Sequence, residues 1–234
     1  MPRFFVPKQE IGSSFLVLTG ENAAHAKVLR LKNGDDVTIC DGEGTDYICT
    51  VSDVANGQIS LVVHSADPSQ SEPKVACSVY MAFAKADKFE HVIQKATELG
   101  AAELVCFPSV RCVSRPDEKS LVKKLDRWQS RRGRIPQVIA LPSYSSALAR
   151  AAEADLAVCF YENEEQLTFR AAIEAAPFQT ASLLTGPEGG FESEEVRQAA
   201  EAGLKICTLG SRILRCETAP LCALSALMYA AGEF

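Results

Sequence analysis

The sequence lacks a long hydrophobic run, and this argues against a membrane-spanning segment. Its longest apolar stretch, residues 221–231, is interrupted by Ser225 and falls short of the roughly 20 residues that a helix needs to cross a bilayer. The first ten residues, MPRFFVPKQE, lack the basic segment, apolar core and small-residue cleavage site of a secretory signal. We therefore expect a protein that stays in the cytoplasm and has no membrane partner.

Paired cysteine motifs are also missing. The nine cysteines are odd in number and form no CxxC pair, which gives no support for a disulfide framework or a zinc site. Most of them lie in apolar, strand-like runs such as 75–79, 104–107 and 157–160, where a free cysteine behaves as a small core residue. The sequence therefore predicts no metal and a reducing compartment.

Positive charge is scarce overall but concentrated in one segment. The chain has 24 Lys and Arg against 30 Asp and Glu, a net charge of -6, which argues against coating nucleic acid through bulk electrostatics. Residues 111–134, however, hold nine basic and three acidic residues, a balance of +6. Such a segment can neutralise phosphates locally, although a solvated helix face with a basic end is the simpler interpretation on composition alone.

The first 66 residues predict a small β-barrel or sandwich. Strand-like segments at 15–18, 36–40, 47–51 and 59–63 are separated by Gly34-Asp35, 41–44 and Asn56-Gly57, and Gly, Asn and Asp at these breaks suit tight turns. One helical segment, 21–29, interrupts the strands. Residues 67–73 then have the polar, proline-punctuated composition of a linker.

From residue 74 to 234 the pattern changes to alternating strands and helices. Apolar runs of four to eight residues that alternate with helical periods are typical of βαβ units around a parallel sheet. The final helix is apolar on nearly all sides, so it should be buried on more than one side, in the core or in a dimer interface. The expected strands are 75–83, 103–107, 156–161, 181–185 and 205–209, and the expected helices are 88–99, 193–202 and 219–231.

Two segments combine a strand end, glycines and a helix start. In residues 183–191 (LLTGPEGGF) three glycines and a proline follow a strand, which is where ligands bind in open α/β sheets. This loop lacks the GxGxxG and GxxxxGK[ST] phosphate motifs, and by itself it could be only a turn. Residues 209–219 (LGSRILRCETA) place Ile213 and Leu214 in an otherwise polar connection. These two side chains could simply attach the connection to the core.

Taken together, these two segments and their spacing resemble the RsmE family of the SPOUT class of RNA methyltransferases. The resemblance implies S-adenosylmethionine-dependent methylation of N3 of a uridine in 16S ribosomal RNA, either on naked RNA or on the assembled small ribosomal subunit. It also implies a C-terminal SPOUT-type domain with a trefoil-knotted parallel sheet, a preceding PUA-like β-barrel domain that binds RNA, and a homodimer. The likeness extends through residues 1–5, His25, 28–30, Gly34-Asp35, Asp41-Gly42, Gly44, Lys85, Asp87-Lys88, Glu90, 94–100, Arg111 and 127–130.

The same resemblance implies which residues form the site. Uridine N3 must lose its proton before attack. Arg215 is the candidate for stabilising the resulting anion, and Glu188 and Glu217 are candidate bases, although either glutamate could be structural. Ile213 and Leu214 would give the adenine an apolar wall. The expected donor-binding residues are Leu184, Thr185, Gly186, Pro187, Glu188, Gly189, Gly190, Leu209, Gly210, Ile213, Leu214, Thr218 and Ala219. The expected RNA contacts are Arg3, His25, Arg30, Arg111, Arg132 and Arg134.

One departure from the family pattern keeps alternatives open. Trp128 is followed directly by Gln129-Ser130, where family members carry further helical turns. A non-catalytic RNA-binding or ribosome-assembly module with the same fold is one alternative. A nucleotide- or phosphate-using enzyme, with residues 186–190 as its anion loop, is the other. A thermal shift with S-adenosylmethionine and none with NAD or ATP would separate the methyltransferase from that last reading.

Overall fold

The computed structural model describes residues 1–69, 73–114 and 137–234. The chain divides between residues 72 and 73 into two compact units, each with its own buried apolar core.

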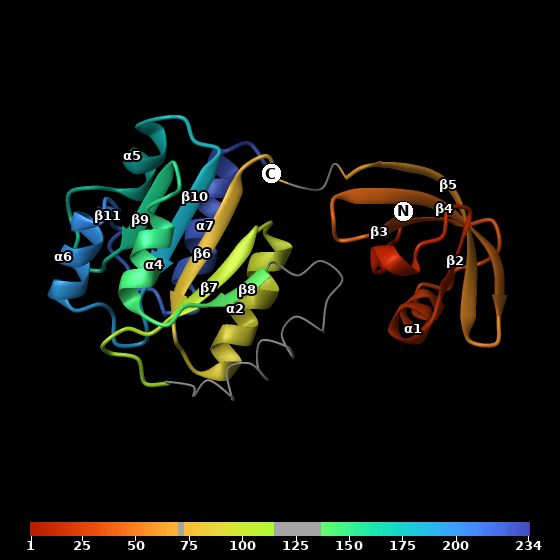
Figure 1. The fold of residues 1–234 in the computed structure, drawn as a ribbon, viewed down its shortest axis with the longest axis horizontal. Helices are drawn as coiled ribbons and strands as arrows, with labels where there is room; N and C mark the ends of the chain where they lie inside the picture. The colour runs from red at the N-terminus through yellow and green to blue at the C-terminus, as the bar shows by residue number, and fades with distance from the viewer. Residues whose placement is uncertain (70–72, 115–136) are drawn as a thin grey trace. The chain divides into compact units, whose positions relative to one another are not determined.

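The N-terminal unit is built on a five-stranded sheet (Figure 1). Its strand order is β1-β3-β4-β5-β2, in which β1 runs parallel to β3 and the other neighbours are antiparallel. Alternate side chains of these strands meet α1 in the core, as expected for a sheet with one buried face. The elements are β1 (Arg3–Phe5), a 3-10 helix (Lys8–Glu10), β2 (Phe15–Leu18), α1 (Gly20–Val28), β3 (Asp36–Cys40), β4 (Thr45–Ala55) and β5 (Gln58–Pro68).

The hairpin between β4 and β5 has the predicted Asn-Gly turn. Asn56 and Gly57 have φ angles of 52° and 73°, as the two central residues of a type I′ turn require. The strands are longer than the apolar pattern predicted, and β5 continues to Pro68, which pairs with Thr45. This extension is possible because strands pair through hydrogen bonds between backbone groups, which do not require apolar side chains. Strand residues therefore reach into the segment with linker composition.

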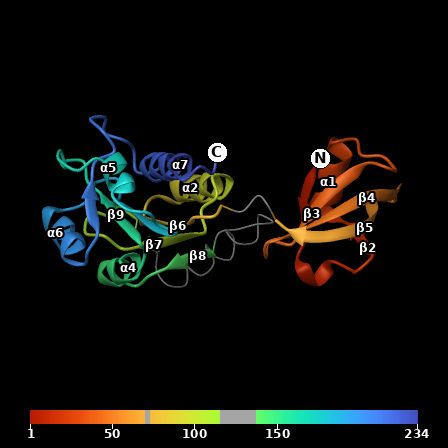
Figure 2. The ribbon, with the colours of Figure 1, turned by 90° about the horizontal axis from the view of Figure 1, so that it is seen from above.

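The C-terminal unit contains a parallel six-stranded sheet in the order β11-β9-β10-β6-β7-β8. This arrangement confirms the predicted α/β class. Figure 2 shows α2 and α7 on one face of this sheet and α4 on the other. The elements are β6 (Ala76–Ala82), α2 (Ala86–Glu98), β7 (Glu103–Phe107), β8 (Gln137–Ala140), α4 (Tyr144–Ala151), β9 (Leu156–Phe160), α5 (Phe169–Glu174), β10 (Thr180–Thr185), α6 (Ser193–Glu201), β11 (Lys205–Cys207) and α7 (Ala219–Ala230).

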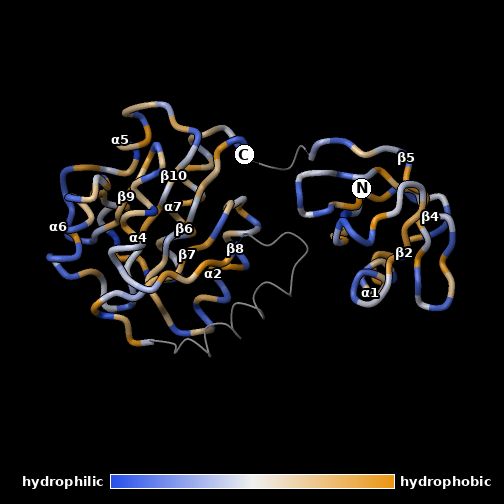
Figure 3. Tube along the Cα trace, viewed as in Figure 1, coloured by the Kyte–Doolittle hydropathy of each residue, from blue (hydrophilic) through white to orange (hydrophobic). Residues whose placement is uncertain are grey.

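Hydrophobic residues of this unit lie along both its strands and its helices (Figure 3). All five residues of β9 are buried, as expected for a strand covered on both faces. Among the described residues, no helix has the length and apolar character to cross a membrane.

Helix α7 buries one face and exposes the other. The buried face packs on α2, β6 and β10. On the opposite face Cys222, Ala226 and Tyr229 are exposed, Tyr229 by 76%. Burial on more than one side, which its apolar sequence predicted, is therefore not reached within one chain. The buried residues are Pro220, Ala223, Leu224, Leu227 and Met228.

Candidate active site

A cavity of about 870 Å³ lies at the carboxyl ends of β9, β10 and β11. The two segments singled out in the sequence line it together: the glycine loop, residues 186–190, and the arginine loop, residues 210–215. The volume is in the range of small-molecule sites, and the position is the one expected for ligands of open α/β sheets.

The glycine loop has no room for side chains at two of its positions. Gly190 has a φ of 68°, and a Cβ there would collide with the Glu162 carboxylate. A Cβ at Gly189 would lie 3.0 Å from the Cβ of Arg111. Within the loop the Gly190 N–H donates to the Pro187 carbonyl at 3.0 Å. The glycines therefore allow a tight turn to approach its neighbours closely.

The arginine loop lies open at the cavity. Ile213 is 89% exposed and Leu214 is half-buried, so the interpretation that these side chains attach the loop to the core is wrong for Ile213. Both residues line the cavity instead. Gly210, with a φ of 102°, allows the chain to turn after β11.

Lys88 of α2 joins the glycine loop to the residues that directly follow the arginine loop. Its Nζ lies 3.2 Å from the Glu217 carboxylate, 3.6 Å from the Glu188 carboxylate and 3.5 Å from Cys216 Sγ. Glu188 also accepts the Lys85 N–H at 3.3 Å. The other oxygen of Glu188, Oε2, is buried and has no hydrogen-bond partner among the described residues.

Lys88 and Glu217 stay charged at neutral pH. Burial acts to lower the pKa of Lys88, but its contacts with Glu217 and Cys216 outweigh burial and raise it. A backbone N–H, together with Cys216 and Lys88, lowers the pKa of Glu217. Burial raises the pKa of Cys216 to about 11, so this thiol stays protonated. The cavity thus presents fixed charges of both signs next to an apolar wall.

The other predicted donor-binding residues take different positions. Thr185, Leu209 and Ala219 line the cavity. Leu184 is fully buried in the core behind it, and Thr218 is an exposed residue at the start of α7. Neither of these two is among the cavity-lining residues.

The predicted RNA contacts lie in both units. Arg3 forms an ion pair with Asp46 at 2.8 Å, His25 packs edge-on against Phe4, and Arg30 has a left-handed backbone with a φ of 56°. Arg111 lies at the glycine loop, where it donates to the Gly189 carbonyl at 3.1 Å. Arg132 and Arg134 lie outside the described residues.

Some cavity residues were not predicted. Lys88, Tyr161 and Glu162 line the cavity but were not among the residues predicted for the site. The rule that ligands bind beyond strand carboxyl ends could have identified the latter two, because they follow β9 directly. Among the described residues, no group of three or more His, Cys, Asp or Glu side chains could hold a metal ion.

Two family models match the chain. One describes an RNA methyltransferase domain and covers residues 71–228, and the other describes an RNA methyltransferase PUA domain and covers residues 18–63. The class of protein is therefore an RNA methyltransferase domain preceded by a PUA domain.

Comparison with individual proteins narrows the class. Ribosomal RNA small subunit methyltransferase E of Bacillus subtilis (strain 168) is 34% identical and aligns over 98% of this chain and 96% of its own. The enzyme of the same name from Mesomycoplasma hyopneumoniae (strain 232) is 32% identical, over 94% and 96%. The chain belongs to the ribosomal RNA small subunit methyltransferase E family.

Solved structures agree with this assignment. Ribosomal RNA small subunit methyltransferase E from Neisseria gonorrhoeae, solved with S-adenosyl methionine, has a TM-score of 0.78 at 27% identity and covers 98% of this chain and 97% of its own. A Legionella pneumophila methyltransferase, solved with the bound cofactor SAM, has a TM-score of 0.78 at 28% identity over 97% of both chains.

Proposed function

We propose that this protein transfers a methyl group from S-adenosylmethionine to N3 of a specific uridine in 16S ribosomal RNA, in the cytoplasm. The observation that carries the proposal is the single cavity lined by both the glycine loop and the arginine loop. Family membership supports methyl transfer to ribosomal RNA of the small subunit.

The residues of the cavity fit the methyl donor. Ile213 and Leu214 offer an apolar wall for adenine, and the glycine loop offers backbone groups at close approach. The donor carries an amino group and a sulfonium centre, and the unpartnered oxygen of Glu188 is an acceptor suited to cationic groups. When bound, S-adenosylmethionine supplies an electrophilic methyl group.

The charged residues at the cavity would remove the proton from uridine and stabilise the resulting negative charge. A carboxylate of Glu188 or Glu217 accepts the N3 proton of uridine, and N3 then forms the bond to the methyl carbon as the sulfur–carbon bond breaks. Arg215 stabilises the negative charge that develops on the uracil ring. Alignment of N3 with the methyl group supplies much of the acceleration, because the reaction is a single in-line displacement.

The N-terminal unit contributes RNA binding in this proposal, through Arg3, His25 and Arg30, with domain limits at 1–66 and 74–234. The left-handed backbone of Arg30 belongs to the end of α1, where the Arg30 N–H donates to the Lys27 carbonyl and the Leu31 N–H donates to the Ala26 carbonyl.

A trefoil knot of the C-terminal unit is part of the proposal. The course of the chain supports it: β11 lies at one edge of the sheet beside β9, yet α7, which follows the 208–218 connection, packs on β6, β10 and α2. The connection must therefore return across the end of the sheet, where the glycine loop lies.

A homodimer through the exposed face of α7 is also proposed. Cys222, Ala226 and Tyr229 form a row of apolar or weakly polar side chains along one helix face, which is costly to leave in water. Tyr229→Asp should shift the protein from dimer to monomer in size-exclusion chromatography with light scattering. A wild-type monomer would contradict the dimer without affecting the site.

The activity is tested with labelled S-adenosylmethionine and small subunits, or their deproteinised RNA, from cells that lack this enzyme. We expect label at N3 of one uridine, located by nuclease digestion and mass spectrometry. Donor binding without transfer would instead favour the non-catalytic RNA-binding or ribosome-assembly module. Absence of donor binding would overturn the proposal.

A further inference from the structure

Glu195 of α6 is a buried carboxylate behind the glycine loop. Its residue is only 4% exposed. One oxygen, Oε1, accepts the Ser109 hydroxyl at 2.8 Å and the Val110 N–H at 3.0 Å, and Oε2 accepts the Glu192 N–H at 2.9 Å. Burying a carboxylate is costly unless several donors satisfy it. These bonds tie the turn that follows β7, residues 109–112, to the first turn of α6.

The turn at 109–112 packs directly on the glycine loop. Arg111 donates from Nη1 to the Gly189 carbonyl at 3.1 Å, and its Nε lies 3.6 Å from the Glu192 carboxylate. The peptide between Gly189 and Gly190 is therefore satisfied at both ends, because the Gly190 N–H donates to Pro187. Such a peptide is fixed before any ligand arrives.

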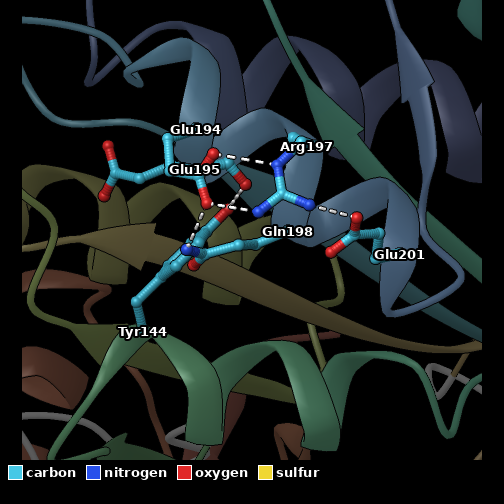
Figure 4. Close-up of polar contacts among 6 residues, drawn as sticks. All are labelled: Tyr144, Glu194, Glu195, Arg197, Gln198 and Glu201. Atoms are coloured by element: carbon cyan, nitrogen blue, oxygen red, sulfur yellow. Dashed lines mark hydrogen bonds and ion pairs between the residues drawn. The ribbon is translucent and has the colours of Figure 1, made fainter.

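The helix that carries Glu195 is itself held in place. The Tyr144 hydroxyl of α4 donates to the Glu195 carbonyl at 2.8 Å (Figure 4). The Tyr144 ring packs between Phe107 and Phe191, with ring centroids 5.7 Å and 5.8 Å away. Glu195 thus links a rigid aromatic cluster to Arg111 and, through it, to the glycine loop.

We propose that Glu195 is a positioning residue for donor binding, acting through the 109–112 turn and the Arg111 bond to Gly189. The inference rests on the proposed function, because it assigns the methyl donor to the glycine loop. Glu195 is not among the residues that line the cavity. Its carboxylate places Arg111, which in turn fixes the Gly189–Gly190 peptide and so lowers the conformational cost of binding the donor.

The helix also offers a matched control. Glu194, the neighbour of Glu195, is 56% exposed in its side chain and bonds Arg197, which also pairs with Glu201 (Figure 4). Glu194→Gln therefore changes the same charge, by the same substitution, without touching the 109–112 turn.

The test measures affinity for S-adenosylmethionine by calorimetry, well below the unfolding temperature, and thermal unfolding without donor. We expect Glu195→Gln and Arg111→Met each to weaken donor binding by roughly tenfold, as expected for loss of a charge-assisted hydrogen bond. The double variant Glu195→Gln/Arg111→Met should lose less donor affinity than the product of the two single losses, because both substitutions act on the position of the Gly189–Gly190 peptide. Glu194→Gln should bind as the wild type does. Saturating donor should restore kcat in both variants.

The outcomes separate this inference from the proposed function. A folded Glu195→Gln with wild-type donor affinity and only a lower Tm would make Glu195 purely structural and overturn the inference, while the function stands. Fully independent effects of the two substitutions would overturn the route through Arg111. If Glu195→Gln fails to fold, the Arg111→Met variant is tested alone. Wild-type donor affinity in Arg111→Met would then show that Glu195 does not act through Arg111. A wild-type protein that binds no donor overturns both proposals.

Discussion

The two loops of the cavity differ in how firmly the protein holds them. The glycine loop is fixed by the Pro187–Gly190 bond within it, by Arg111 from the 109–112 turn and by the Lys85 N–H on Glu188. In the arginine loop Ser211, Arg212, Ile213 and Arg215 are exposed, and no side-chain partner of Arg212 or Arg215 is found among the described residues. One wall is preformed, whereas the other presents free functional groups. Under the proposed function, the glycine loop would offer preformed backbone groups to the donor, and Arg215 of the arginine loop would be free to act on the RNA.

The largest expected effect comes from the arginine loop. Arg215→Ala should lower kcat for methyl transfer by roughly 100-fold or more, the loss typical of a group that stabilises developing charge, with little change in donor affinity. Single-turnover transfer from labelled donor measures this effect. Arg212→Ala, in the same exposed loop, is the control and should have a much smaller effect. Equal losses in both variants would mean that the loop contributes only general positive charge.

The next effect comes from the glycine loop. Gly190→Ala should weaken donor binding by tenfold or more, because alanine is strained at a φ of 68° by about 1–2 kcal/mol and its Cβ meets the Glu162 carboxylate. Calorimetry with S-adenosylmethionine measures the change.

Gly203→Ala is the matched control for Gly190→Ala. Gly203 has a φ of 97° and open space where a Cβ would stand, so alanine there adds backbone strain away from the cavity and meets no neighbouring atom. It should lower Tm but leave donor affinity intact. If both variants bind donor normally, the glycine loop does not hold the donor.

The smallest effect concerns the ion pairs of Lys88 with Glu188 and Glu217. Lys88→Met removes the cation shared by Glu188 and Glu217 and should destabilise the fold at pH 7 by about 1 kcal/mol or less, because the pair is partly solvated. The pKa of Glu217 is lowered in the fold, so its stabilisation is present above the ordinary glutamate value and is lost as pH falls through the lower folded value.

Urea unfolding at pH 7 and near pH 3 measures this dependence. The difference between wild type and Lys88→Met should narrow at the lower pH. Lys95→Met, which breaks an exposed pair with Glu98 on the same helix, is the control and should have little effect at pH 7. A difference that does not depend on pH would assign the effect to packing of the lysine stem rather than to the ion pair.

Local signals predicted much of this fold. The Asn56-Gly57 pair indicated a hairpin turn. The helix predicted at 88–99 corresponds to α2, and its apolar residues Phe89, Val92, Ile93 and Ala96 form the buried face. Helix α4 was missed because its N-terminal signal is unusual: Ser143 and Ser146 cap it reciprocally, whereas the usual pattern has Glu or Gln at the fourth position. Strand β8 is only four residues long and partly polar at its start.

The site was predictable only in part, for a physical reason. Glycines after a strand indicate a loop that approaches something closely, so the glycine loop could be located. The role of Lys88 depends on Glu188 and Glu217, which lie more than 100 residues away along the chain. The sequence also does not show whether an apolar residue in a polar loop faces the core or a ligand. Ile213 required the structure to decide.

The exposed face of α7 carries a cysteine that can serve as a natural probe of self-association. Of the nine cysteines, all of them free, Cys222 is the one that is exposed, while seven are buried and Cys112 is half-buried. A thiol reagent added to the folded protein should therefore modify Cys222 first, and any molecule that covers this helix would slow that modification. Labelling rates followed across a dilution series would then trace self-association without any engineered probe.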